Sequence, residues 1–149
     1  MKKFSFKFQK VMDVKESLEK QKMLELTEAE RQLQQARGYL EEVVTAQAEY
    51  QRRYNTRRKN GTVRSAEVRN YLRYIDKLSG DIDNQKRVID QKTDIKESKR
   101  RELLALVKDK KILEKLKEYH LSEYTREARH QEQVFLDEVG SVRSSRREN

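Results

Sequence analysis

A heptad repeat of mostly apolar residues in the first half of the chain limits its possible folds more than any other feature. Between positions 26 and 54 these residues recur alternately every three and four positions, which places them along one side of an α-helix. The repeat comprises Leu26, Ala29, Leu33, Ala36, Leu40, Val43, Gln47, Tyr50 and Tyr54. Because a narrow stripe of this kind is buried by packing against another helix, the repeat predicts a coiled coil.

A second repeat with the same spacing follows a turn signal. It comprises Val68, Tyr71, Ile75, Leu78, Ile82, Gln85 and Ile89. Between the two repeats, Asn60 and Gly61 tolerate the positive φ of a tight reversal, and Ser65 can cap the helix that follows. The sequence therefore predicts that one helix ends near Arg58 and that another begins near Ser65.

The two repeats fit one antiparallel register. The pairs expected in contact are Tyr54 with Tyr71, Tyr50 with Ile75, Gln47 with Leu78, Val43 with Ile82, Leu40 with Gln85 and Ala36 with Ile89. Every pair has its midpoint between Thr62 and Val63, which lies inside the expected turn. Two separately identified repeats and a turn signal thus agree, which favours this register over others.

These patterns predict an all-α fold, namely a long two-helix antiparallel coiled-coil hairpin with an overhanging C-terminal helix. Residues 1–149 form a single coiled-coil domain in this interpretation. The expected parts are a first helix over residues 4–58, a turn over 59–64, a second helix over 65–139 and a flexible tail over 140–149.

The second helix is expected to extend beyond its partner. If the pairing continues in the same register, Phe4 lies near Leu121, and the residues that follow have no partner within the chain. The aromatic and apolar residues left over are Tyr124, Val134, Phe135 and Val139. A partly apolar helix face without a partner in its own chain is typical of a surface that binds another protein.

The composition favours long helices over a compact core, because 34% of the residues are hydrophobic and 41% are charged. The formal net charge of +9 allows nucleic acid, an anionic membrane or an acidic protein as a partner. Acidic residues are nevertheless spread among the basic ones, as on solvent-exposed helix surfaces. Since no segment reaches the length of a membrane span, we expect a soluble or peripherally bound protein.

The sequence offers no catalytic or cofactor-binding motif. It has no cysteine, which excludes disulfides and thiolate metal sites, and its four glycines are too far apart for a phosphate-binding loop. Glu127 and His130 have the spacing of one di-iron ligand pair, but such a site needs two pairs and further glutamates. We therefore expect neither an enzyme nor a protein with a metal or cofactor.

Tyrosines are concentrated near the turn, where five of the seven lie between Tyr39 and Tyr74. Those at core positions of the repeats, Tyr50, Tyr54 and Tyr71, either only thicken the core or also serve a binding surface. Tyr39 and Tyr74 fall instead on one flank of the predicted hairpin, together with Ala46 and Val88. Aromatic residues beside a coiled-coil core are typical of a protein-binding surface.

Basic residues surround the same region, and Glu67 is the expected local acidic counterpart. They are Arg52, Arg53, Arg57, Arg58, Lys59, Arg64 and Arg69. A cluster of this density can hold phosphate groups of a nucleic acid, or it can steer an acidic protein surface into place. The residues alone leave both interpretations open.

Three segments of the sequence resemble the FliJ family of the bacterial flagellar type III export apparatus, to which injectisome stalk proteins are related. They are FSFKFQKVMDVKE, AEYQRRYNTRRKNGTVRSAEVRNYLRYIDKL and EKLKEYHLSEYTREARHQEQVFLDEVG, of which the central one is the most specific. The resemblance implies a non-enzymatic two-helix antiparallel coiled coil, similar to the paired helices of the rotary ATP synthase gamma subunit.

The resemblance also implies partners for the terminal end of the hairpin. Members of the family insert this end into the hexameric ring of the export ATPase, FliI. On this chain the residues at that end are Phe4, Phe8, Tyr124, Val134, Phe135 and Val139. The implied location is the cytoplasm, peripheral to the cell membrane through partners.

The turn-proximal half is implied to meet the cytoplasmic domain of the export gate protein, FlhA, and the family is also associated with substrate-specific export chaperones. Carried onto this sequence, the gate-binding patch comprises Tyr39, Val43, Ala46, Tyr50, Tyr74, Leu78 and Gln85. Two departures are Ala46, at a position where an aromatic residue occurs in the family, and Asp81, which interrupts the patch.

Two alternatives accompany this interpretation. One is a basic coiled-coil protein that binds nucleic acid through the arginines near the turn. The abundant acidic residues on each predicted helix disfavour it, so nucleic acid is not among the expected partners. The other is the equivalent stalk protein of an injectisome, which works by the same mechanism.

Overall fold

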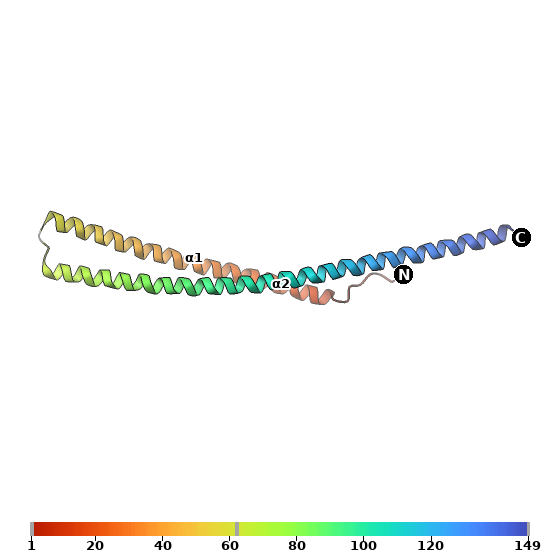
Figure 1. Cartoon of the computed structure of the whole chain (residues 1–149), viewed down its shortest axis with the longest axis horizontal. Helices are drawn as coiled ribbons and strands as arrows, with labels where there is room; N and C mark the ends of the chain where they lie inside the picture. The colour runs from red at the N-terminus through yellow and green to blue at the C-terminus, as the bar shows by residue number, and fades with distance from the viewer. Residues whose placement is uncertain (1, 62, 149) are drawn as a thin grey trace. The chain divides into compact units, whose positions relative to one another are not determined.

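The structure is a computed structural model that describes residues 2–61 and 63–148, and this part of the chain is all-α. Helix α1 spans Gln9–Asn60 and helix α2 spans Ser65–Arg147. The two helices run antiparallel and are joined by a turn after Asn60 (Figure 1). The antiparallel two-helix prediction is therefore confirmed.

The chain divides into two compact units, each of which contains part of both helices. We call Gln21–Leu103 the hairpin unit, because it includes the turn. Met1–Lys20 together with Leu104–Asn149 form the terminal unit. The expectation of a single domain stays a prediction, and the two units are described in turn.

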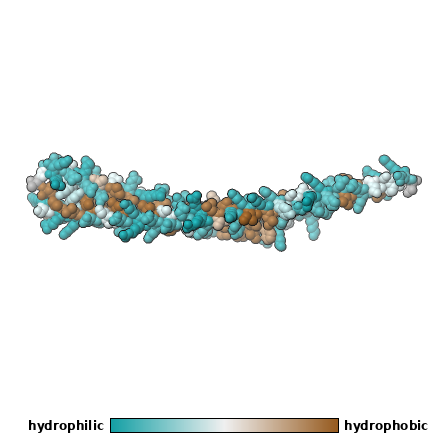
Figure 2. All heavy atoms as spheres, in the orientation of Figure 1, coloured by the Kyte–Doolittle hydropathy of each residue, from teal (hydrophilic) through white to brown (hydrophobic). Residues whose placement is uncertain are grey.

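The core of the hairpin unit is a thin apolar layer between α1 and α2. Its buried side chains are Ala29, Leu33, Ala36 and Val43 from α1 and Leu78 from α2. All five are positions of the predicted repeats, and Leu33 is the most deeply buried, with 1% of its surface exposed. Hydrophilic side chains cover most of the face shown in Figure 2, as expected when only a narrow stripe of each helix is buried.

Contacts across the hairpin unit confirm the antiparallel register. The rings of Tyr54 and Tyr71, an expected pair, stack with their centroids 3.7 Å apart. The side-chain amide of Gln47 donates a hydrogen bond to the hydroxyl of Ser79, at 2.9 Å, one residue from its expected partner. Farther from the turn, the ammonium of Lys92 donates to the amide oxygen of Gln32 at 3.0 Å.

Gln85 differs from the expected pattern. Its side-chain amide donates to the backbone carbonyl of Ala36 at 2.9 Å, one turn away from its expected partner Leu40. Leu40 has no side-chain acceptor, and a half-buried amide is costly unless it finds one. The need of the Gln85 amide for an acceptor therefore moves its contact from Leu40 to Ala36, while the register of the two helices is kept.

A four-residue ion network lies at the other end of the hairpin unit. The ammonium of Lys22 contacts the carboxylates of Glu102, at 2.8 Å, and of Glu25, at 3.0 Å. Lys99 contacts Glu25 at 3.1 Å and Glu102 at 3.9 Å. Each charge therefore faces two opposite charges, one on its own helix and one on the other.

The turn differs in detail from its prediction. Helix α1 continues through Asn60, and no residue in the described part of the chain has a positive φ, so the expected left-handed reversal at Asn60 and Gly61 was wrong. The first hydrogen bond of α2 runs from the Val68 N–H to the Arg64 carbonyl, one residue before the predicted cap at Ser65. Glu67 lies in the first turn of α2, as expected. Thr62, part of the predicted turn, lies outside the described residues.

In the terminal unit, ion pairs and a hydrogen bond join the start of α1 to α2. Lys15 pairs with Asp109 at 3.3 Å, and Glu19 pairs with Lys110 at 3.4 Å. The ammonium of Lys117 donates to the side-chain oxygen of Gln9 at 2.8 Å. The antiparallel pairing therefore holds in this unit as well.

The predicted start of the first helix at residue 4 was wrong, because α1 begins at Gln9. The preceding segment has Phe4, Phe6 and Phe8 at alternate positions, which suits a nonhelical segment with its rings on one side. An extended chain advances about 3.3 Å per residue against about 1.5 Å in a helix. Phe4 accordingly reaches Tyr124, with ring centroids 5.5 Å apart, instead of the expected Leu121.

The C-terminal end of the second helix also lies beyond its predicted limit. Helix α2 continues through Gly140 to Arg147, so the expected boundary at residue 139 was wrong. One exposed glycine costs a helix only about 1 kcal/mol, which a long helix tolerates. The segment expected to overhang is the last part of α2 itself and not a separate helix. No helix in the described part of the chain is both long and apolar enough to cross a membrane.

Candidate partner-binding surfaces

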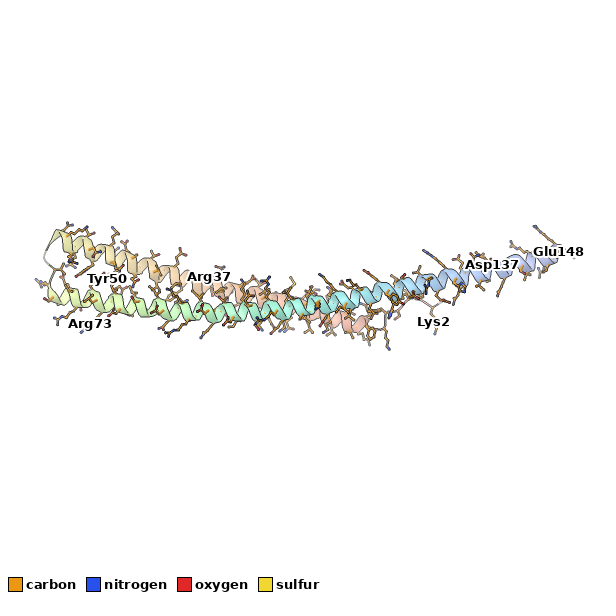
Figure 3. All side chains as sticks on the ribbon, viewed as in Figure 1. Lys2, Arg37, Tyr50, Arg73, Asp137 and Glu148 are labelled. Carbon is orange, nitrogen blue, oxygen red and sulfur yellow. The ribbon has the colours of Figure 1, made fainter. Side chains whose placement is uncertain are left out.

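Four tyrosines near the turn form a ladder of rings that crosses between α1 and α2. The Tyr54 ring is nearly parallel to that of Tyr71, and the Tyr71 ring lies 5.6 Å from that of Tyr50, again nearly parallel. Tyr50 then meets Tyr74 edge to face, with centroids 4.5 Å apart. Figure 3 places Tyr50 between the two helices near the turn. The core tyrosines thus fill the interface and also support Tyr74, whose own side chain is exposed.

A hollow of about 400 Å³ lies beside the tyrosine ladder. It is lined by Tyr50, Arg53, Tyr54, Arg57, Val63, Glu67, Asn70 and Tyr71. In Figure 1 α1 and α2 run side by side up to the turn, and near it stacked tyrosine rings take the core positions that alanines occupy farther along. The hollow was not predicted from the sequence, where its only signal is the run of tyrosines at successive core positions.

The predicted gate-binding patch is split by the structure. Val43 and Leu78 are buried in the core between the helices, and the half-buried Gln85 is bonded to Ala36. Tyr39, Ala46 and Tyr74 are exposed, and Tyr50 is half-buried. Asp81 is half-buried as well. The side chains open to a partner are therefore those that the register had placed on the flank.

The arginines near the turn have more acidic partners than expected. Glu49 accepts hydrogen bonds from Arg52, at 2.7 Å, and from Arg53, at 3.1 Å. Arg57 contacts Glu67 at 3.0 Å. The expectation that Glu67 alone opposes the cluster was wrong, because Glu49 lies one helical turn before the arginines.

The ion pair of Glu49 with Arg52 shifts the pKa of both members. The hydrogen bond from Arg52 lowers the pKa of Glu49 below its usual value, and the same contact raises the pKa of Arg52. The Arg52 side chain is 69% exposed and the Glu49 side chain 41%, so water screens the pair and its contribution to stability is small. The other predicted members of the cluster, Arg58, Lys59, Arg64 and Arg69, are exposed.

At the terminal end, residues 2–8 form a strap against α2. The ring of Phe6 lies 5.8 Å from both the Phe8 and the His120 rings and is 6% exposed. The hydroxyl of Tyr124 donates to the backbone carbonyl of Lys2 at 2.6 Å. Tyr124 was expected to have no partner within the chain, and the strap shows that this was wrong. Phe6 was missed, although its place in an alternating Phe-x-Phe-x-Phe pattern signalled it.

Beyond Tyr124, α2 continues with a stripe of apolar residues, which we call its heptad face. Ala128, Phe135 and Val142 recur every seven residues, a spacing that places them on one side of the helix. Within residues 126–148 every side chain is exposed except those of Ala128 and Val139, which are half-exposed. The expected apolar surface therefore exists, with Phe135 and Val134 exposed and Val139 at its side.

A family model, that of the flagellar FliJ protein, matches residues 4–149. The chain belongs to the FliJ family. Neither the comparison with curated proteins nor that with solved structures gave a significant match.

Membership of the FliJ family makes the chain a non-enzymatic, coiled-coil component of the flagellar protein export apparatus. The resemblance carried by the three sequence segments is thereby confirmed. Within the part of this FliJ chain that the structure describes, no three histidine or acidic side chains are grouped closely enough to hold a metal ion. Its two candidate surfaces are the tyrosine flank near the turn and the exposed heptad face of α2.

Proposed function

We propose that this FliJ-family chain couples the export ATPase to the export gate through two separate surfaces. The exposed heptad face of α2 docks into a FliI-type hexameric ring. The tyrosine flank near the turn, Tyr39, Ala46 and Tyr74, binds the cytoplasmic domain of an FlhA-type gate protein. The chain then works in the cytoplasm at the inner side of the cell membrane, held there by its partners.

The observation that carries this proposal is the exposed heptad face past the strap. Phe135 and Val142 are 62% and 52% exposed, on one side of a helix that packs against no other helix there in the described part of the chain. A helix face of this kind is completed by a partner that supplies the missing surface. A ring with an apolar inner surface is such a partner.

The gate surface is supported by the tyrosine ladder. Tyr74 is exposed, but its ring packs edge to face against Tyr50, which is itself stacked on Tyr71. The Tyr74 ring is therefore held in place before any partner binds. A side chain ordered in advance loses little conformational entropy on binding. The exposed Arg58, Arg64 and Arg69 add positive charge that speeds the approach of an acidic surface. Export chaperones are further proposed partners.

Truncation tests the assignment of the two surfaces. A variant that lacks residues 131–149 keeps the strap contacts and the hairpin unit but loses Phe135 and Val142. We expect its helicity per residue and its gate binding to be retained and its binding to the purified export ATPase hexamer to be abolished. Undiminished binding to the hexamer would show that the heptad face is not the docking element.

A further inference from the structure

Helix α2 exposes a second face in the terminal unit, which the proposed contacts with the ring and the gate leave unexplained. We call it the outer face. It consists of Leu104, Lys108, Lys111, Ile112, Lys115 and Tyr119, all of them exposed. Steps of three and four residues place them on one side of α2 over about 22 Å of helix. The apolar members are large, and Ile112 exposes 58% of its surface.

The strap and α1 lie against a different side of α2, which leaves the outer face open. Asp109, Lys110 and Lys117 bond to residues of α1, and His120 contacts Phe6 of the strap. The lysines of the outer face lie on the side of α2 opposite the residues that make these contacts. Lys108, Lys111 and Lys115 therefore project away from the coiled coil.

The outer face is positively charged. Three of its six residues are lysines and none is acidic, although Glu114 and Glu118 lie at one edge. In the ion pairs of Lys22 and Arg52, by contrast, the basic side chain lies directly beside a carboxylate. The outer face thus combines exposed apolar side chains with positive charge that is compensated only at its edge.

We propose that the outer face of α2 binds the surface of a bilayer that contains anionic lipids. A helix that lies in the membrane interface has lysines for the headgroups and apolar side chains that enter the acyl boundary. Lysines flanking an apolar residue can extend their ammonium groups back to the phosphates, and tyrosine is common at this depth. Leu104, Ile112 and Tyr119 supply the apolar contacts.

The shape of the face favours a bilayer over other anionic partners. It is the convex side of one helix, and its apolar side chains are separated by lysines, so it offers no groove to a protein. A nucleic acid would contact the lysines but would gain little from exposed Leu104 and Ile112, because its affinity comes mainly from phosphates. A fluid lipid surface can adapt to a convex face and bind both the lysines, through its phosphates, and the apolar side chains, through its acyl chains.

The number of charges sets the strength of binding. Each lysine near an anionic membrane surface raises the affinity about five- to tenfold. This attraction falls off with distance from the surface over about one Debye length, which salt shortens. Three lysines and three apolar residues therefore give weak, reversible binding that salt suppresses. The proposal does not depend on contacts with the ATPase or the gate, because the isolated chain carries the whole face.

Sedimentation of the purified full-length chain with vesicles tests the proposal. We expect binding to vesicles of phosphatidylglycerol and phosphatidylcholine, much weaker binding to phosphatidylcholine alone, and loss of binding at high salt. Replacing Lys111 and Lys115 by glutamine should weaken the binding about thirtyfold. The matched control replaces the exposed Lys77 and Lys86 of the hairpin unit, which removes the same charge and should change binding far less.

An apolar pair of variants tests the second half of the face. Ile112→Ser should weaken vesicle binding, whereas Leu72→Ser, at a residue with 53% exposure in the hairpin unit, should not. Since the chain has no tryptophan, Tyr119→Trp gives one fluorescent reporter. Its emission should shift to the blue when anionic vesicles are added, while that of Tyr39→Trp should stay unchanged.

Three results would overturn the proposal. The first is equal binding to anionic and neutral vesicles, and the second is an equal loss in the Lys77 and Lys86 control, which would indicate net charge alone. The third is no vesicle binding together with binding of duplex DNA that needs Lys111 and Lys115, which would assign the face to nucleic acid. Circular dichroism of each variant shows whether the helices are intact.

Discussion

The rings of Tyr54 and Tyr71 lie face to face, 3.7 Å between centroids and 7° from parallel, although 17 positions separate them in the sequence. Rings stacked this closely cover much of each other's faces, so the pair stabilises the hairpin mainly through the apolar area that it buries. The pair is the aromatic contact nearest the turn, and it sets which residues of α1 and α2 meet along the rest of the hairpin unit.

The register predicts which distant positions approach each other. Spin labels at the exposed Val44 and Asp83, beside the core pair Val43 and Ile82, should show strong dipolar coupling within one molecule. Moving the second label to Arg101, about 27 Å farther along α2, should remove it. If the coupling of the first pair vanishes on dilution with unlabelled chain, the contact is between two molecules and the hairpin register is contradicted.

The buried layer predicts a large difference between two leucines of α1. Leu33→Ala should lower the free energy of unfolding by about 2–5 kcal/mol, because the residue is almost fully buried. Leu24→Ala is the control, since Leu24 is 73% exposed and should change stability by less than about 0.5 kcal/mol. Urea denaturation followed by circular dichroism measures both. Equal effects would place Leu33 outside the core. Ile82 is half-buried, so its truncation should cost less than that of Leu33.

The ion network of the hairpin unit predicts how stability depends on pH. Hydrogen bonds from Lys22 and then Lys99 lower the pKa of Glu25, and one from Lys22 lowers that of Glu102. A carboxylate with a lowered pKa stabilises the fold above its ordinary value of 4.5, and this stabilisation is lost as the pH falls below it. The pKa of Lys22 is raised by Glu102 and Glu25, so its contribution is lost above 10.5.

Between pH 4.5 and pH 10.5 the wild-type chain should melt at a higher temperature than the Glu25→Gln, Glu102→Gln variant. The difference should shrink as the pH is lowered through 4.5, because both chains then lack the charged network. Replacing the exposed Glu41 and Glu42 by glutamine removes two carboxylates outside the network and serves as the control. A melting difference that is the same at acid and neutral pH would show that the network does not act through charge.

The repeats were enough to predict the fold because every fully buried side chain in the described part of the hairpin unit belongs to them. Ala29, Leu33 and Leu78 are buried by the same periodic stripe that identified the helices, and the register followed from matching two stripes about one turn. The predictions failed where the conformation of a segment depends on contacts with residues from another part of the chain. The alternating phenylalanines, for example, form a strap only because His120 and Tyr124 offer a surface for them.

The candidate surfaces could be predicted only in part. Tyr39 and Tyr74 were placed on a flank by register alone and are exposed as expected. Val43 and Leu78 were carried over from the family resemblance and are buried between the helices, where a partner reaches them only if the helices separate. The hollow beside the tyrosine ladder depends on how far the rings hold the helices apart, and the sequence does not state that distance.

The tyrosine flank predicts separate losses of binding for two exposed tyrosines. Tyr74→Ala should weaken binding to the gate protein's cytoplasmic domain by about thirtyfold, as truncation of an aromatic hot spot typically does. Tyr119→Ala, at an exposed tyrosine of the terminal unit, should leave gate affinity unchanged. Calorimetry with the purified domain measures both. An unchanged affinity for Tyr74→Ala, or a parallel loss of helicity, would remove the flank from the mechanism.

The strap predicts that one phenylalanine holds the N-terminal residues against α2. Phe6 is 6% exposed and packs on His120, whereas Phe135 in the same unit is 62% exposed. Phe6→Ala removes the one fully buried side chain among strap residues 2–8, while the half-buried Phe4 and Phe8 and one hydrogen bond from Tyr124 remain. The residues before α1 should then exchange their amide hydrogens much faster and become accessible to proteases, and Phe135→Ala should change neither. Because α1 and the hairpin unit do not depend on the strap, the helicity of Phe6→Ala should stay close to that of the wild type. If the N-terminal amides of Phe6→Ala stay as protected as before, the strap is held by its backbone contacts and not by this ring.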